Sequence, residues 1–209
     1  EEEICFIHDA KEESIQTILD MARYKEEGRL KALVVTGCLA QRYKQEIIDE
    51  IPEVDVVLGT TSYDKIVEAV EEALEGKSEV ELADIDALPL PETKRLVTTG
   101  GHYAYLKIAE GCDNNCTFCI IPNIRGRQNS RKITDVLAEV KTMLANGIRE
   151  VQILAQDTTR YGTDINDGKS LLLDLLEEID QAHLSRYHHS LAIFVQTLDQ
   201  IVIFPVVHV

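Results

Sequence analysis

Residues 110–119 read EGCDNNCTFC, with cysteines spaced four and then three residues apart. Cys112, Cys116 and Cys119 are three of the five cysteines in a chain of 209 residues. Thiols grouped this closely indicate soft-metal ligands rather than disulfide partners. A structural zinc site normally has four protein ligands, and no further Cys or His follows at the usual spacing. An iron–sulfur cluster held by three thiolates would instead keep one iron open to a substrate or cofactor. A zinc site or a purely structural cluster is the alternative.

The CxxxCxxC spacing, with an aromatic residue before the last cysteine, resembles the signature of radical S-adenosylmethionine (radical SAM) enzymes. This resemblance implies that Cys112, Cys116 and Cys119 bind a [4Fe–4S] cluster whose open iron takes S-adenosylmethionine. It also implies that Phe118 lies beside the adenine of that cofactor, although packing of the loop would equally explain an aromatic residue there. Reductive cleavage of the cofactor to a 5′-deoxyadenosyl radical requires an external electron donor.

Three further motifs are similar to those of the methylthiotransferase branch of this family. They are IIP followed by RGR at 120–127, VTGCLAQRY at 35–43 and AQDTTRYG at 155–162. The last motif resembles RimO-type enzymes, which insert a methylthio group at the β-carbon of an aspartate in a small-subunit ribosomal protein. The tRNA-modifying MiaB-type enzymes, which carry Asn-rich residues at that point, are the alternative, as is an inactive metal-binding fragment. The resemblance covers roughly residues 4–181.

Cys38 and Cys5 are candidates for a second cluster. Either cysteine alone could be a small buried side chain. Both, however, end expected strands of one parallel sheet, where ligands collect beyond the carboxyl ends. In methylthiotransferases an auxiliary [4Fe–4S] cluster binds three cysteines of the N-terminal domain. By resemblance Cys38 matches the third of these and Cys5 the second, and the first would lie upstream of Glu1.

The pattern of residues 1–76 predicts a small α/β domain with a parallel sheet. Apolar runs favour strands near residues 4–7, 30–36 and 54–58, and helical periodicity favours helices starting at 9, 39 and 62. The last helix has its apolar stripe at Ile66, Val67, Val70 and Leu74. Strands that alternate with helices indicate a parallel sheet covered by helices. Residues 77–101 are polar and acidic with no sustained period, which predicts a linker.

Residues 102–181 predict the first β/α units of an incomplete radical SAM barrel. Strands are expected at 103–109 and 151–155, and helices at 133–146 and 170–179. In such barrels the chemistry lies on loops at the carboxyl ends of the strands. Gln156 and Asp157 fall on such a loop and are therefore expected to face the cofactor or substrate, with simple loop capping as the alternative.

Two smaller features of the sequence have no single predicted role. Arg125, Arg127 and Arg131 form a basic island that could meet the cofactor carboxylate or an acidic substrate, or be solvated. Residues 182–209 hold four of the six histidines and end in an apolar, β-prone run. This tail resembles nothing in the family, so a truncated or frameshifted reading is expected, and His183, His188 and His189 are assigned no role.

The net charge of −16 argues against a grip on nucleic acid through its phosphates. It suits a basic protein partner such as a ribosomal protein, although acidity can also serve solubility alone. The odd number of clustered cysteines favours a reducing cytoplasm. No apolar run is long enough for a membrane span, and no signal peptide is evident. Since the chain opens on EEE without Met, an N-terminal piece is expected to be missing.

Overall fold

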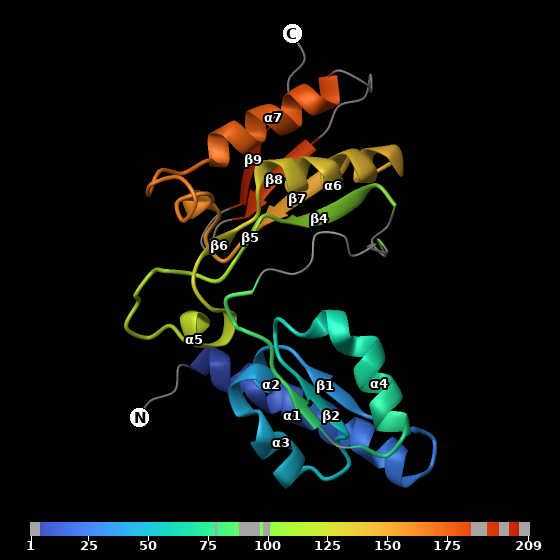
Figure 1. Ribbon diagram of the computed structural model, residues 1–209. Coiled ribbons are helices and arrows are strands. Elements are labelled where there is room, and N and C mark those ends of the chain that lie inside the picture. Colours follow the sequence, from blue (N-terminus) through green and yellow to red (C-terminus); the bar gives the residue numbers. More distant parts are fainter. Residues whose placement is uncertain are drawn as a thin grey trace. The chain divides into compact units, whose positions relative to one another are not determined.

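The chain is described by a computed structural model covering residues 5–77, 79–87, 97, 101–184, 192–196 and 201–204 (Figure 1). It divides into two compact units. The first comprises residues 1–90 and 114–126, and the second comprises residues 91–113 and 127–209. Most of the cysteine loop is therefore grouped with the first unit. The sequence pattern had placed that loop wholly within the second domain, because it follows a strand there.

The first unit contains a three-stranded parallel sheet. Strands β1 (Val34–Thr36), β2 (Val56–Leu58) and β3 (Glu79–Glu81) lie in the order β1-β2-β3. Its helices are α1 (Cys5–Glu26), α2 (Cys38–Tyr43), α3 (Gln45–Glu50), α4 (Ile66–Leu74) and α5 (Ile121–Arg125), with a 3-10 turn η1 (Tyr63–Lys65) before α4. The predicted parallel α/β unit is thus confirmed. Strand β3 falls inside the predicted linker, because a three-residue Glu-Val-Glu strand carries no apolar run to signal it.

Both faces of this sheet are covered. Val57 of β2 packs in a core with residues of α1, α2 and α3. Val56 and Leu58 point to the opposite face, where they pack with Ala69 and Ala73 of α4. Burial on two faces explains why the strand reads as a continuous apolar run rather than an alternation.

Two predicted elements of the first unit need correction. Cys5 does not end a strand but is the first residue of helix α1, so the predicted strand at 4–7 is wrong. A short apolar run cannot be distinguished from the start of a buried helix by periodicity alone. The predicted helix from 39 to 51 is divided into α2 and α3 at Lys44, whose φ of 47° interrupts the helical backbone.

The apolar stripe of α4 faces outward. Val67 is 66% exposed and Leu74 is 56% exposed, and Ile66 and Val70 are also exposed. The buried residues of this helix are Ala69 and Ala73. Small side chains bring the helix close to β2, which turns the larger apolar residues to solvent.

We expect Ala69→Leu to destabilise the first unit by about 1–3 kcal/mol, because three added carbons must enter a filled space between α4 and β2. Val67→Ser, on the same helix, should change the free energy of unfolding by less than about 0.5 kcal/mol. Urea unfolding followed by circular dichroism compares the two variants. A larger loss for Val67→Ser than for Ala69→Leu would contradict the observed orientation of α4.

The second unit contains a four-stranded sheet. Strands β4 (Tyr103–Lys107), β7 (Glu150–Leu154) and β8 (Ala192–Gln196) are parallel neighbours, and β9 (Ile201–Phe204) pairs antiparallel with β8. Helix α6 (Ile133–Ala145) connects β4 to β7 after a short hairpin of β5 (Ala109–Glu110) and β6 (Asn129–Ser130). The 3-10 turn η2 (Thr158–Arg160) and helix α7 (Leu172–Leu184) connect β7 to β8. The two predicted β/α units are present, whereas their assignment to an incomplete radical SAM barrel stays a prediction.

The tail joins this sheet. Strand β9 lies within the apolar run that the sequence marked as β-prone, and β8 was not predicted. The side chains of both strands, and those of His183, His188 and His189, lie outside the described residues. Between the sheet and helices α6 and α7 lies a core whose largest fully buried members include Leu106, Ile153, Leu175 and Ile179.

None of the helices in the described part of the chain is both long enough and apolar enough to cross a membrane.

Candidate cofactor site

The first cysteine of the motif is held by the second unit. Strand β5 leads into Gly111, whose φ of 69° is a left-handed value that favours glycine. Cys112 follows and is buried. Asp113 then accepts a hydrogen bond from the backbone N–H of Gln128 at 3.3 Å, which ties the start of the loop to the β6 side of the hairpin. The backbone around Cys112 is thus fixed from both sides.

The other two cysteines belong to the segment grouped with the first unit. The N–H of Cys119 donates to the carbonyl of Cys116 at 3.0 Å, so a tight turn joins them. Cys116 is exposed and Cys119 is half-buried. Phe118 between them is 70% exposed, so its ring does not pack the loop, and its place beside an adenine stays a prediction.

Helix α5 anchors this segment within the first unit. The hydroxyl of Thr60 donates to the carbonyl of Ile124 at 3.0 Å, and α5 packs against α2. Gly126 ends the helix with a φ of 76°, and a Cβ there would lie 2.7 Å from the carbonyl oxygen of Ile85. Only glycine fits that position without displacing the backbone beside it.

Cys38 lies at the predicted place, the carboxyl end of a strand. It begins α2 after the turn at Gly37 that follows β1. On the same helix Gln41 is buried and accepts a hydrogen bond from the N–H of Thr60, beyond the end of β2, at 3.1 Å. The carboxyl ends of β1 and β2 are therefore joined beside the helix that Cys38 begins. The side chain of Cys5 lies outside the described residues.

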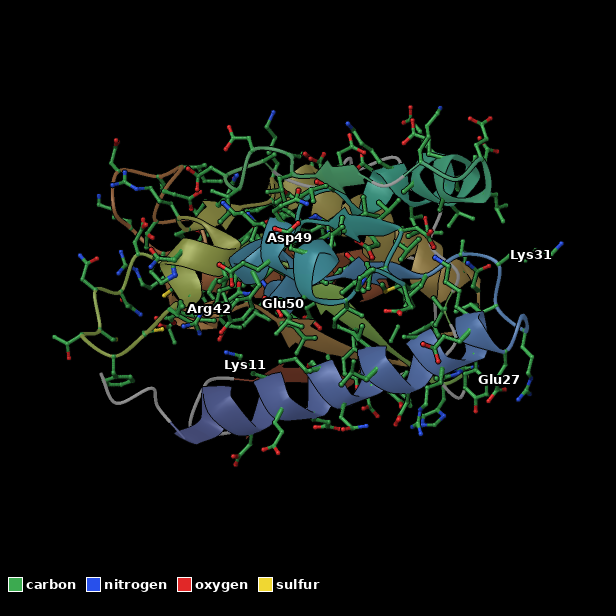
Figure 2. The ribbon with its side chains drawn as sticks, turned by 90° about the horizontal axis from the view of Figure 1, so that it is seen from below. Lys11, Glu27, Lys31, Arg42, Asp49 and Glu50 are labelled. Carbon is green, nitrogen blue, oxygen red and sulfur yellow. The ribbon has the colours of Figure 1, made fainter. Side chains whose placement is uncertain are left out.

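Tyr43, the last residue of α2, has cations over its ring. The Lys11 ammonium of α1 lies 4.5 Å from the ring centroid, and the Arg42 guanidinium lies 5.2 Å from it. Figure 2 shows Lys11 rising from α1 on the side that faces α2 and α3. Cation–π contacts of this kind fix α1 against the helix that carries Cys38.

The chemistry of the donors fits an iron–sulfur cluster, although the described residues do not form a complete cage. Cys38, Cys112, Cys116 and Cys119 all carry thiols that are not in disulfides. Thiolate is the ligand that such clusters require. Within the described ranges, no three His, Cys, Asp or Glu side chains are gathered as ligands of a metal ion. The assignment of these cysteines, and of Cys5, as ligands therefore stays a prediction.

Gln156 and Asp157 follow β7 in the second unit. Asp157 accepts hydrogen bonds from the backbone N–H and the hydroxyl of Thr159, at 3.1 and 2.6 Å, and so caps η2. This is the loop-capping role that the sequence left open for it. Gln156 instead donates from Nε2 to the carboxylate of Glu110 at 2.9 Å. Gln156 is thus directed toward the residue that precedes the cysteine loop.

Glu110 is a site residue that sequence reasoning missed. It is only 6% exposed, forms an ion pair with Lys107 and lies within 3.4 Å of the N–H of Gly111. The signal that could have found it is a Lys and a Glu three residues apart at the end of a strand, directly before the first cysteine. A carboxylate at that position is buried only because it is paired.

The loop after β7 is hydrogen-bonded to strand β6. The hydroxyl of Ser130 accepts from the N–H of Gly162 at 2.9 Å, and the carboxylate of Asp164 accepts from the N–H of Ser130 at 2.8 Å. Arg131 donates to the carbonyl of Lys107 and to the carboxylate of Glu139. Of the three arginines in the basic island, Arg131 is therefore engaged in holding the hairpin to α6.

The buried hydroxyl of Tyr161 makes the stability of the second unit depend on pH. Its hydroxyl donates to the carbonyl of Arg131 at 2.7 Å. Burial, opposed by the charge of Arg131, raises the pKa of Tyr161 from 10.0 to about 12. The stabilisation is fully present below the pKa of the unfolded chain, and is lost as the pH rises from about 10 to about 12, because the unfolded chain releases its proton first. We expect wild type to lose about 2 kcal/mol more than Tyr161→Phe across that range, measured by urea unfolding at each pH. Identical losses in both proteins would contradict the buried, protonated hydroxyl.

Comparison with known proteins places these features in a family. A family model described as "Uncharacterized protein family UPF0004" matches residues 4–59. The ribosomal protein uS12 methylthiotransferase RimO of Lachnoclostridium phytofermentans is 54% identical over 175 residues, which is 84% of this chain and 40% of that protein. The protein of the same name from Clostridium tetani is 51% identical over 177 residues, again 84% of this chain and 40% of that protein.

Among solved structures, the radical S-adenosylmethionine methyltransferase TsrM from Kitasatospora setae is similar over 76% of this chain and 34% of its own. The identity is 13% and the TM-score is 0.48, so this similarity assigns no function. The chain spans about 40% of the length of these curated relatives. Their identity to this chain over 84% of its length supports its assignment to the RimO-type methylthiotransferases.

Proposed function

We propose that the chain supplies the part of a methylthiotransferase that binds its cofactors, and that the target is the β-carbon of an aspartate in ribosomal protein uS12. The observation that carries this proposal is the 54% identity to a relative named for uS12 methylthiotransfer. The cysteine loop supports it, since it offers three thiols directly after a strand of the second unit.

Cys112, Cys116 and Cys119 would hold the first [4Fe–4S] cluster. When bound with S-adenosylmethionine and reduced by an electron donor, that cluster supplies the radical chemistry. The protein's own residues hold and orient the group. Gly111 and Asp113 fix the backbone on either side of Cys112, and the turn from Cys116 to Cys119 sets the spacing of the other two thiols.

Cys38 and Cys5 would contribute to the auxiliary [4Fe–4S] cluster. Both residues begin helices of the first unit, α2 and α1. The position of Cys38 beyond β1, where α2 packs on α5, supports a ligand role, because bound groups collect at the carboxyl ends of parallel strands.

The acidity of the chain supports a basic protein as substrate. With a net charge of −16, the chain would repel the phosphates of tRNA and attract a cationic ribosomal protein. A ribosomal substrate also agrees with the predicted cytoplasmic location.

A chimaera tests the choice of substrate. The 175 residues of this chain that align with the Lachnoclostridium relative replace the matching segment of that protein, and the purified chimaera is incubated anaerobically with S-adenosylmethionine, sulfide, dithionite and either uS12 or tRNA. Mass spectrometry should find a methylthio group on an aspartate of uS12. Modification of tRNA alone would contradict the proposal and favour the MiaB type, and modification of neither substrate, with the unaltered relative active, would favour an inactive metal-binding segment.

A further inference from the structure

We infer that Glu110 is a positioning residue that orients the amide of Gln156 so that its oxygen is presented to a nitrogen donor of bound S-adenosylmethionine. The inference rests on the proposed function, and all the residues involved belong to the second unit. Glu110 ends β5, and Gln156 follows β7.

The carboxylate of Glu110 is buried beside a cation. Its side chain is 7% exposed and is paired with the ammonium of Lys107, which stays 43% exposed. A buried charge requires such a partner. In its contacts with Lys107, with the N–H of Gly111 and with Gln156, the carboxylate is the acceptor of the hydrogen bond.

The amide of Gln156 is oriented by its hydrogen bond to Glu110. Because the carboxylate of Glu110 is the acceptor, the group that Gln156 turns toward it is the NH₂, which donates at 2.9 Å. The amide oxygen is therefore turned the other way. A neutral or donating side chain at position 110 would allow the amide to flip and present its NH₂ instead.

The amide oxygen of Gln156 is the atom available to a ligand. Gln156 Oε1 is buried, and within the described residues it has no hydrogen-bond partner. A buried acceptor without a donor is costly, so this atom favours a ligand that brings an N–H group. The methionine end of S-adenosylmethionine carries an ammonium and its adenine carries an amino group, and both are such donors.

The chain provides a matched control for this pair. On the same strand, Gln152 Nε2 donates to the carboxylate of Glu150 at 3.1 Å. Glu150 begins β7, at the end of the strand opposite to Gln156. Glu150→Gln therefore makes the same chemical change to the same kind of pair, away from the cysteine loop.

The test measures binding of S-adenosylmethionine to the whole chain after anaerobic reconstitution with iron and sulfide. The dissociation constant is obtained by titration, and the shift of the reduced cluster's EPR spectrum on adding the cofactor is recorded alongside. Glu110→Gln should weaken binding on the order of tenfold and diminish the spectral shift. Glu150→Gln should leave both readings at the wild-type value, and thermal unfolding of each variant shows that the fold is retained.

A double variant separates orientation from charge and remains decisive if Glu110→Gln does not fold. In Glu110→Gln/Gln156→Glu the donor and the acceptor exchange places, and an oxygen is still presented at position 156. Binding should return to within about threefold of wild type. Wild-type binding by Glu110→Gln, an equal loss in Glu150→Gln, or a folded double variant that binds no better than the single one would each overturn the inference while the proposed function stands. A wild-type chain that binds a cluster but no S-adenosylmethionine would overturn both.

Discussion

Cys112→Ala should lower the iron content of the anaerobically reconstituted chain by about four atoms per chain, because two thiolates do not retain a [4Fe–4S] cluster. Cys112 is the buried member of the trio, fixed between the left-handed Gly111 and the hydrogen-bonded Asp113. Its replacement removes a ligand without disturbing the exposed remainder of the loop. Iron and sulfide assays, with the visible absorbance of the cluster, provide the measurement.

Thr117→Ala is the control for that experiment. Thr117 is exposed and lies in the same loop, but it has no thiol. Its iron content should equal that of the unchanged chain. If Cys112→Ala, Cys116→Ala and Cys119→Ala each keep the iron content of the unchanged chain, the motif is not the cluster site and the functional assignment fails with it.

Ile153→Ala should lower the free energy of unfolding of the second unit by about 2–5 kcal/mol. Ile153 is fully buried on β7, in the core formed with α6 and α7. Truncation leaves a cavity between the sheet and those helices, and the close-packed surroundings can fill it only in part.

Leu173→Ala is the matched change at the surface. Leu173 lies on α7 and is 67% exposed, so its loss should cost less than about 0.5 kcal/mol. Urea titrations followed by circular dichroism give both values. Similar midpoints for the two variants would show that β7 does not lie at the centre of the core.

The sequence predicted four of the parallel strands, β1, β2, β4 and β7, but missed β3 and β8. Strand β2 is buried on both faces and forms a continuous apolar run, whereas β4 and β7 bury alternate residues. The same signal failed at Cys5, where an apolar run begins a helix. It also failed at α4, where periodicity shows that an apolar stripe exists but not which way it faces. The alanines decide the packing there.

The candidate ligands could be predicted from the sequence, but the residues that hold and orient the site could not. Cysteine spacing marks Cys112, Cys116 and Cys119, and the turn after a strand marks Cys38. Glu110 escaped notice because its role depends on Gln156, 46 residues further along the chain. Pairings between separate strand ends are set by the fold, and no local pattern records them.

The measurement that tests the account most directly is EPR of the reduced, anaerobically reconstituted chain before and after addition of S-adenosylmethionine. The account predicts a [4Fe–4S] signal that shifts when the cofactor is added, with about four irons per chain, or about eight if Cys5 and Cys38 also hold the auxiliary cluster. A chain that takes up only zinc, or a cluster whose spectrum does not change with S-adenosylmethionine, would contradict it.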